Sequence, residues 1–138
     1  MADVVDYTDL VLEKLRTLRT LTIYDGDVDD NPPDDRQGRV YPYAVMWPSP
    51  GTPALETITA QAGEPITLDW DFQITCVGGT RRWCQQSVVL VRSVLTNLNL
   101  GDGAGILREQ VNKDLPILKD KDVTPIRYFY PLRYKALI

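Results

Sequence analysis

The feature that most constrains the fold is a long alternation of apolar and polar residues between Thr67 and Val77. Side chains of a β-strand point alternately to its two faces, so a period of two predicts a strand here. One face belongs to a core, and the other faces solvent or a partner. The apolar members are Leu68, Trp70, Phe72, Ile74 and Cys76, and the polar members are Thr67, Asp69, Asp71, Gln73 and Thr75.

Two segments instead have the three-and-four spacing of amphipathic helices. The first helix is expected over residues 7–20, and the second runs from a Thr80 N-cap to about Asn97, after Gly78 and Gly79 end the long strand. Their apolar stripes are Tyr7, Leu10, Val11, Leu15 and Leu18 in the first, and Cys84, Val88, Val91, Val94, Leu95 and Leu98 in the second.

Shorter strands are expected at residues 21–24, 40–47, 54–60, 106–111 and 126–138, with a rigid turn at 48–53 and a loop at 113–122. Pro42 makes its strand an edge strand or a bulged one, and Pro131 divides or bends the last strand. This order predicts an α+β fold: a mixed or antiparallel β-sheet with two α-helices packed on one face. The length of 138 residues indicates a single domain over 1–138.

Residues 25–38 form the most unusual segment, with six aspartates and two adjacent prolines. Such a segment has little to bury, so an exposed acidic loop is expected. It lacks the central glycine and closing glutamate of a calcium loop. Five of its carboxylates are candidate interface residues: Asp27, Asp29, Asp30, Asp34 and Asp35.

Composition disfavours several classes of function. The chain has no histidine, which removes histidine-based triads, zinc sites and proton shuttles. A net charge of −4 disfavours non-specific nucleic-acid binding. No apolar run reaches the length of a membrane span, and the acidic N-terminus does not resemble a secretory signal, so an intracellular product without a membrane is expected.

Cys76 and Cys84 are eight positions apart, which does not fit a C-x-x-C redox or zinc pair. In a reduced cytosol we expect two semi-buried thiols. A disulfide between the end of the strand and the following helix is the alternative.

Asp69 and Asp71 lie on the same face of the predicted strand. Two neighbouring carboxylates could hold a divalent ion or act as an acid/base pair. We favour solvated aspartates on an exposed strand face, which need no metal. We treat both as candidate interface residues, and expect no catalytic residue, metal or cofactor.

Arg81 and Arg82 open the second helix after a Gly-Gly-Thr turn. A phosphate cradle is one interpretation, but neither glycine-rich nucleotide motif is present. Two arginines in a first turn oppose the helix dipole. We therefore expect the carboxylates of a partner to approach these arginines.

The C-terminal strand interleaves aromatic and basic residues. Single-strand nucleic-acid platforms combine these residue types, but aromatic residues and arginine are also enriched at protein–protein interfaces. The negative net charge favours the second interpretation. The strand contains Phe129 and contributes the interface candidates Arg127, Tyr128, Tyr130, Arg133, Tyr134 and Lys135.

Three segments together resemble a known family. These are the Pro-Tyr-Ala-Val strand at 42–45, the Asp-Trp-Asp-Phe-Gln-Ile-Thr strand at 69–75, and the Val/Leu-rich helix ending near Leu98, preceded by an N-terminal amphipathic helix. In this order they resemble the lambda-like tail terminator proteins of long-tailed phages. The acidic Pro-Pro loop and the C-terminal strand with Pro131 do not match that pattern.

The resemblance implies a structural virion protein made in the bacterial cytoplasm and located at the tail–neck junction. It would form a ring, usually hexameric, that caps the tail tube and joins the tail to the head–neck connector. DNA would pass through the ring without specific binding, and an acidic lumen would repel its phosphates. The acidic loop lines the lumen or contacts the tube.

Three alternatives stay open. The chain could be another neck protein, a stopper or adaptor, although stoppers are largely β-barrels. It could be a small metal-dependent enzyme that uses Asp69 and Asp71. It could also be a nucleic-acid-binding module that uses its C-terminal strand.

Overall fold

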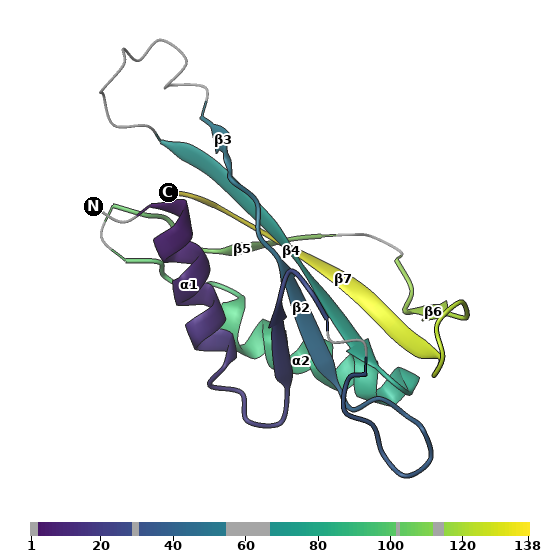
Figure 1. The fold of residues 1–138 in the computed structure, drawn as a ribbon. Coiled ribbons are helices and arrows are strands. Elements are labelled where there is room, and N and C mark those ends of the chain that lie inside the picture. Colours follow the sequence, from purple (N-terminus) through teal and green to yellow (C-terminus); the bar gives the residue numbers. More distant parts are fainter. Residues whose placement is uncertain (1–2, 29–30, 55–66, 102, 112–114) are drawn as a thin grey trace.

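The structure is a computed structural model that describes residues 3–28, 31–54, 67–101, 103–111 and 115–138. Residues 55–60, most of the strand expected at 54–60, lie outside these ranges. Figure 1 shows the arrangement of the helices and strands. In chain order they are α1 (Val4–Leu15), β1 (Thr22–Asp25), β2 (Tyr43–Trp47), β3 (Thr52–Pro53), β4 (Leu68–Gly78), α2 (Arg81–Leu95), β5 (Arg108–Gln110), β6 (Leu118–Asp120) and β7 (Arg127–Leu137).

The seven strands form one mixed sheet in the order β1-β2-β4-β7-β5, with β3 on β4 and β6 on β7. Strands β1 and β2 are parallel, and the other pairs are antiparallel. The longest ladder joins β4 to β7, from Asp69 opposite Leu137 to Gly78 opposite Tyr128. The predicted α+β class is therefore confirmed.

Strand β4 confirms the predicted period of two. Trp70, Ile74 and Cys76 are fully buried, whereas Asp71 between them is exposed. The even-numbered residues of β4 from Trp70 to Cys76 join one large hydrophobic cluster that also contains residues of both helices. Odd-numbered Val77 instead joins a smaller cluster with Val40, Tyr43 and Val45.

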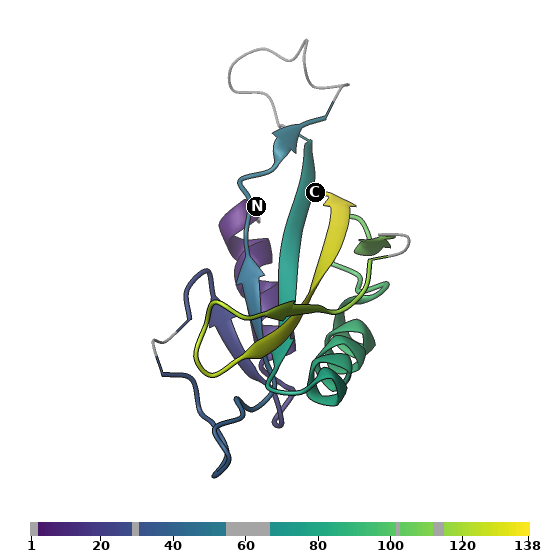
Figure 2. The same ribbon diagram turned by 90° about the vertical axis from the view of Figure 1, so that its right-hand side faces the viewer.

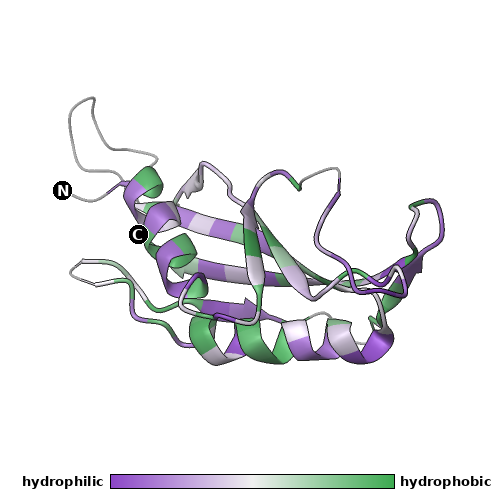
Figure 3. Cartoon of the chain, turned by 60° about the horizontal axis from the view of Figure 1, so that its bottom comes forward, coloured by the Kyte–Doolittle hydropathy of each residue, from purple (hydrophilic) through white to green (hydrophobic). Residues whose placement is uncertain are grey.

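Figure 3 shows that both helices mix hydrophobic and hydrophilic residues along their length, as expected for elements that bury one side. The buried residues of α1 are Tyr7, Val11, Leu12 and Leu15. Those of α2 are Cys84, Ser87, Val88, Val91 and Leu95. The predicted stripes are thus largely confirmed, with half-buried Leu10, Leu18, Val94 and Leu98 packed against the same cluster.

Helix boundaries follow their caps. α1 begins earlier than predicted because Asp3 and Asp6 form a capping box, and it ends at Leu15 instead of residue 20. Thr80 caps α2 as predicted, accepting a hydrogen bond from the Trp83 N–H at 3.1 Å. Among the described residues, neither helix is long and apolar enough to cross a membrane.

Several expectations about strands were wrong. Pro42 does not mark an edge or bulged strand, because β2 directly after it pairs with both β1 and β4 in an unbroken register. The expected loop at 113–122 contains β6, which pairs with β7. The expected turn at 48–53 contains β3, which pairs with β4. Pro131 does not divide the last strand. It lies between the β7 residues that pair with β6 and those that pair with β5. Its missing N–H therefore removes no hydrogen bond to either of these two strands.

Figure 2 shows the β6–β7 hairpin crossing in front of β2 and β4, with α1 behind them. The hairpin thus lies near the face of β4 that carries its odd-numbered residues. The hollow beneath it is lined by Val45, Thr75 and Val77 of the sheet and by Asp120 and Val123 of the hairpin.

Candidate interaction surfaces

The exposed side of α2 is basic at its start and apolar further on. We call the exposed residues Arg81, Arg82, Gln85, Gln86 and Val89 the α2 outer face. The first turn of this helix holds no acidic residue. An Arg81 guanidinium N–H donates to Gln85 Oε1 at 2.7 Å, and Val89 is 64% exposed.

An open hollow of about 620 Å³ lies beside this face. Thr20 and Pro42 form one wall, and Arg82, Val89 and the half-buried Leu90 form the other. The hollow is therefore mainly apolar with a cation at its rim. Gln85 and Gln86 complete the lining.

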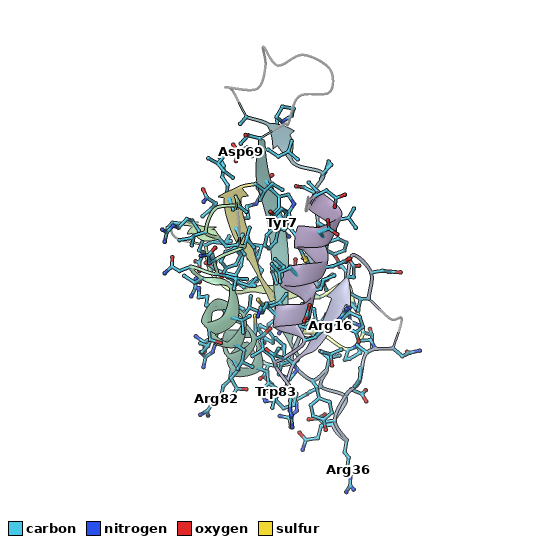
Figure 4. All side chains as sticks on the ribbon, turned by 90° about the vertical axis from the view of Figure 1, so that its left-hand side faces the viewer. Tyr7, Arg16, Arg36, Asp69, Arg82 and Trp83 are labelled. Atoms are coloured by element: carbon cyan, nitrogen blue, oxygen red, sulfur yellow. The ribbon has the colours of Figure 1, made fainter. Side chains whose placement is uncertain are left out.

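Residues 35–41 pack against the start of α2 (Figure 4). The Tyr41 and Trp83 rings stack with centroids 5.6 Å apart, and the Arg39 guanidinium lies 5.3 Å from the Trp83 ring centroid. Arg39 also forms an ion pair with Asp35 at 2.7 Å. Hydrogen bonds from Arg39, through its backbone N–H and then its side chain, lower the pKa of Asp35.

The acidic loop is less uniform than predicted. Asp27 and Asp34 are exposed, but Asp35 is engaged by Arg39, and Pro32 is buried. Asp34 also forms an isolated bridge with Val40. Asp29 and Asp30 lie outside the described residues.

Asp69 forms an ion pair with a lysine of the same chain. Lys135 Nζ lies 3.0 Å from Asp69 Oδ2, and Lys135 is the register partner of Asp71. Asp69 Oδ1 is buried without a hydrogen-bond partner. Within the described residues, no group of three or more potential metal ligands comes together.

The candidates on β7 separate onto the two faces of the strand. Lys135 and Arg133 lie on the odd-numbered face and are exposed, whereas Tyr134 on the other face is fully buried. The expectation that Tyr134 contributes to an interaction surface is therefore corrected: its ring stacks on Phe72 in the core. Its hydroxyl lies 3.1 Å from Thr96 Oγ1, and burial raises its pKa to about 12.

The two other tyrosines of β7, Tyr128 and Tyr130, are half-buried. Tyr130 packs against the large cluster, and the ring centroid of Tyr128 lies 5.7 Å from Lys119 Nζ. The basic residues Arg127, Arg133 and Lys135 share their face of β7 with a single aromatic residue, Phe129, which packs against the smaller hydrophobic cluster. This weakens the nucleic-acid platform interpretation.

Arg127 is half-buried and points into the hollow under the hairpin. One of its guanidinium N–H groups donates to the Tyr43 hydroxyl at 2.8 Å, and its Nε is buried without a partner. Burial raises the pKa of Tyr43, against the opposing effect of Arg127. Arg127 therefore helps to hold the hairpin against the sheet.

Trp47 was not among the predicted site residues, yet its side chain is 43% exposed. It is paired with Gln73, which in turn is paired with Arg133, and Arg133 with Gln110 on β5. These four residues form one row across the exposed sheet face. All five residues from Tyr43 to Trp47 are apolar and the first four are buried, so no alternation in the sequence singles out Trp47.

No known family model matches this chain, and no curated protein matches its sequence.

Proposed function

We propose that this chain is a tail terminator subunit, a structural protein whose ring caps a phage tail tube and joins it to the head–neck connector. The three segments that carry the resemblance form one contiguous unit. β2 is antiparallel to β4, and α2 follows β4 after a two-residue turn and packs on it. DNA passes through the ring without specific binding.

We also propose that both helices cover a single face of the sheet. The support is the composition of the large hydrophobic cluster. It contains Val11 of α1, Val91 of α2 and Trp70 of β4, and the β-strand members on β4 and β7 are even-numbered. The opposite face is then covered partly by the β6–β7 hairpin and otherwise remains open to a partner.

The observation that carries the proposal is the separation of unpaired charges on the surface. Only three ion pairs join described residues, and none of them uses Arg81, Arg82 or Arg133. A head-to-tail ring requires two different patches on each subunit. Exposed arginines on α2 and exposed carboxylates elsewhere supply such patches.

The metal-dependent enzyme is a weaker candidate than the ring subunit. A divalent ion at Asp69 would have to displace the Lys135 ammonium, and Asp71 alone offers few further ligands. Another neck protein remains the second candidate, and the two helices disfavour a barrel-type stopper.

Tube growth in the test tube provides the experiment. Purified chain is added to polymerising tail-tube protein of the same phage, and tube lengths are measured by electron microscopy. A terminator stops elongation and sits as one ring at the tube tip. Tubes that grow unchanged, together with absence of the chain from the tail–neck junction of purified particles, would refute the proposal.

A further inference from the structure

We infer that the hollow beside the α2 outer face receives the exposed side of α1 from a second copy of this chain. The inference rests on the proposed ring and identifies the two surfaces that join its subunits. It follows from two exposed helix faces of opposite charge, each with an exposed valine.

The receiving surface is basic and partly apolar. Arg82 stands at the rim of the hollow, is exposed, and forms no ion pair with any described residue. Val89, 64% exposed, and half-buried Leu90 provide apolar area. Arg82 in the first turn also opposes the helix dipole, so an approaching carboxylate stabilises this end of α2.

The donated surface is the exposed row Val5, Asp9 and Glu13 of α1, which we call the α1 outer face. These residues are four positions apart, so they follow one line along the helix. Val5 is 64% exposed. Asp9 and Glu13 repel each other at this spacing, and no described basic residue pairs with either of them.

The two faces are complementary in charge and chemistry. Each carries one exposed valine and charges of one sign, so contact would bury apolar area and pair arginine with carboxylate. Arginine suits such contacts because its planar guanidinium can bind a carboxylate through two hydrogen bonds. This combination is typical of interfaces between subunits.

The geometry favours a head-to-tail contact between copies. α1 runs from Tyr7, toward the end of the molecule that carries Asp69, to Arg16, nearer the end that carries Arg82 and Arg36 (Figure 4). Different patches at different places give a heterologous contact, which propagates and closes into a ring when the rotation permits.

The acidic loop is a poorer occupant of the hollow. Asp35 is already paired with Arg39, and residues 35–41 pack at the α2 end of the molecule, close to the hollow itself. A head-to-tail contact requires a second patch that is separate from the hollow. The α1 outer face meets that requirement.

A charge exchange on the full chain tests the inference. Arg82→Glu and Asp9→Arg are made singly and together, because neither residue is buried or part of the α1 capping box. Each single variant places like charges in contact and should weaken self-association about tenfold or more. The combined variant restores opposite charges and should recover most of the association.

Association is measured by sedimentation equilibrium over a range of protein concentrations, and by counting subunits at the tips of tail tubes. Arg36→Glu is the matched control, since Arg36 is an exposed arginine at the same end but outside the hollow. Circular dichroism and thermal melting establish that each variant is folded. The control should associate like the unmodified chain.

The inference is overturned if the single variants associate normally, if the combined variant does not recover, or if Arg36→Glu is equally impaired. These results leave the proposed function intact as long as the unmodified chain still stops tube growth. Conversely, charge-dependent association by a chain that never binds tubes would refute the proposed function and retain the interface.

Discussion

Arg92 of α2 binds Glu109 of β5 through two parallel hydrogen bonds, from Nε to Oε1 at 2.8 Å and from a terminal nitrogen to Oε2 at 3.0 Å. The contact connects the second helix to an edge strand of only three residues. The hydrogen bond with Glu109 also raises the pKa of Arg92, so the guanidinium stays charged. This pair fixes β5 more firmly than its short ladder alone.

We predict that Arg92→Lys lowers the free energy of unfolding by about 0.5–1 kcal/mol, because lysine keeps the charge but loses the two-pronged geometry. The value is modest because the Arg92 side chain is 44% exposed. Urea unfolding measures the loss. Arg133→Lys, at an exposed arginine without an ion pair to a described residue, is the control and should leave stability unchanged. Equal stability of both variants would contradict the prediction.

The turn between β4 and α2 depends on close backbone approach at Gly78. A Cβ there would lie 2.5 Å from the Cys84 backbone nitrogen and 2.7 Å from the Trp83 carbonyl carbon. Gly78→Ala should therefore destabilise the fold by roughly 1–3 kcal/mol or more, as overpacking does. Gly105→Ala, whose Cβ would lie 3.1 Å from the Leu137 carbonyl oxygen, should cost less. The ranking is checked by thermal melting, and a reversed order would refute it.

Local sequence signals predicted the central part of the fold. The alternation around Trp70 gave the correct face for every residue of β4 from Asp69 to Cys76, and Thr80 marked the start of α2. These elements are specified by residues within a few positions of each other. Their prediction therefore needs no knowledge of the rest of the chain.

Elements stabilised by distant partners were predicted poorly. β6 has a charged, weakly β-forming sequence and exists as a strand because Lys119 pairs with Tyr128. Pro131 is tolerated because its position on β7 falls between two short edge strands. The burial of Tyr134 could have been predicted, since Leu132 and Ala136 share its parity and one face of β7.

The interaction surfaces depend on where helix faces point after folding. The sequence marked Arg82 as unfavourable in its helix, but the hollow between Pro42 and Val89 arises only when distant segments meet. The same holds for Trp47, whose place beside Gln73 depends on the register of β2 and β4.

Replacing either of two tryptophans in the sheet by alanine should lower the stability of the fold by different amounts. Trp70 is fully buried and donates its indole N–H to the Ser49 carbonyl at 3.1 Å. Trp70→Ala should cost about 3–5 kcal/mol, which can unfold a domain of this size. Trp47→Ala removes a side chain that is 43% exposed and should cost much less. Urea unfolding followed by circular dichroism compares them, and similar losses would contradict this assignment of the core.

Titration with Mg²⁺, Mn²⁺ or Ca²⁺ should give no saturable heat in calorimetry, because the Lys135 ammonium already occupies Asp69. Lys135→Met removes this cation and leaves Asp69 and Asp71 free, so it is the variant in which weak binding could emerge. Saturable binding to the unmodified chain that disappears in Asp69→Asn would refute the prediction and favour the enzyme alternative.

At alkaline pH, ionisation of three buried acidic groups should destabilise the folded protein. Burial raises the pKa of both the Cys76 and Cys84 thiols from 9.0 to about 12, and that of Tyr134 from 10.0 to about 12. The thiols are free, and Cys84 Sγ donates to the Cys76 carbonyl oxygen at 3.4 Å. The folded state therefore keeps three protons that the unfolded chain loses at lower pH.

The sign of the effect follows from proton binding. As pH rises from about 9 to about 12, the unfolded chain binds fewer protons than the folded one, so the free energy of unfolding falls. Below pH 9 the stabilising contribution is fully present. In a Cys76→Ala/Cys84→Ala variant, the decline should begin about one pH unit higher, where Tyr134 becomes the first of these groups to ionise on unfolding. Urea unfolding at a series of pH values measures both curves, and an identical onset in the two proteins would show that the thiols are not buried acids.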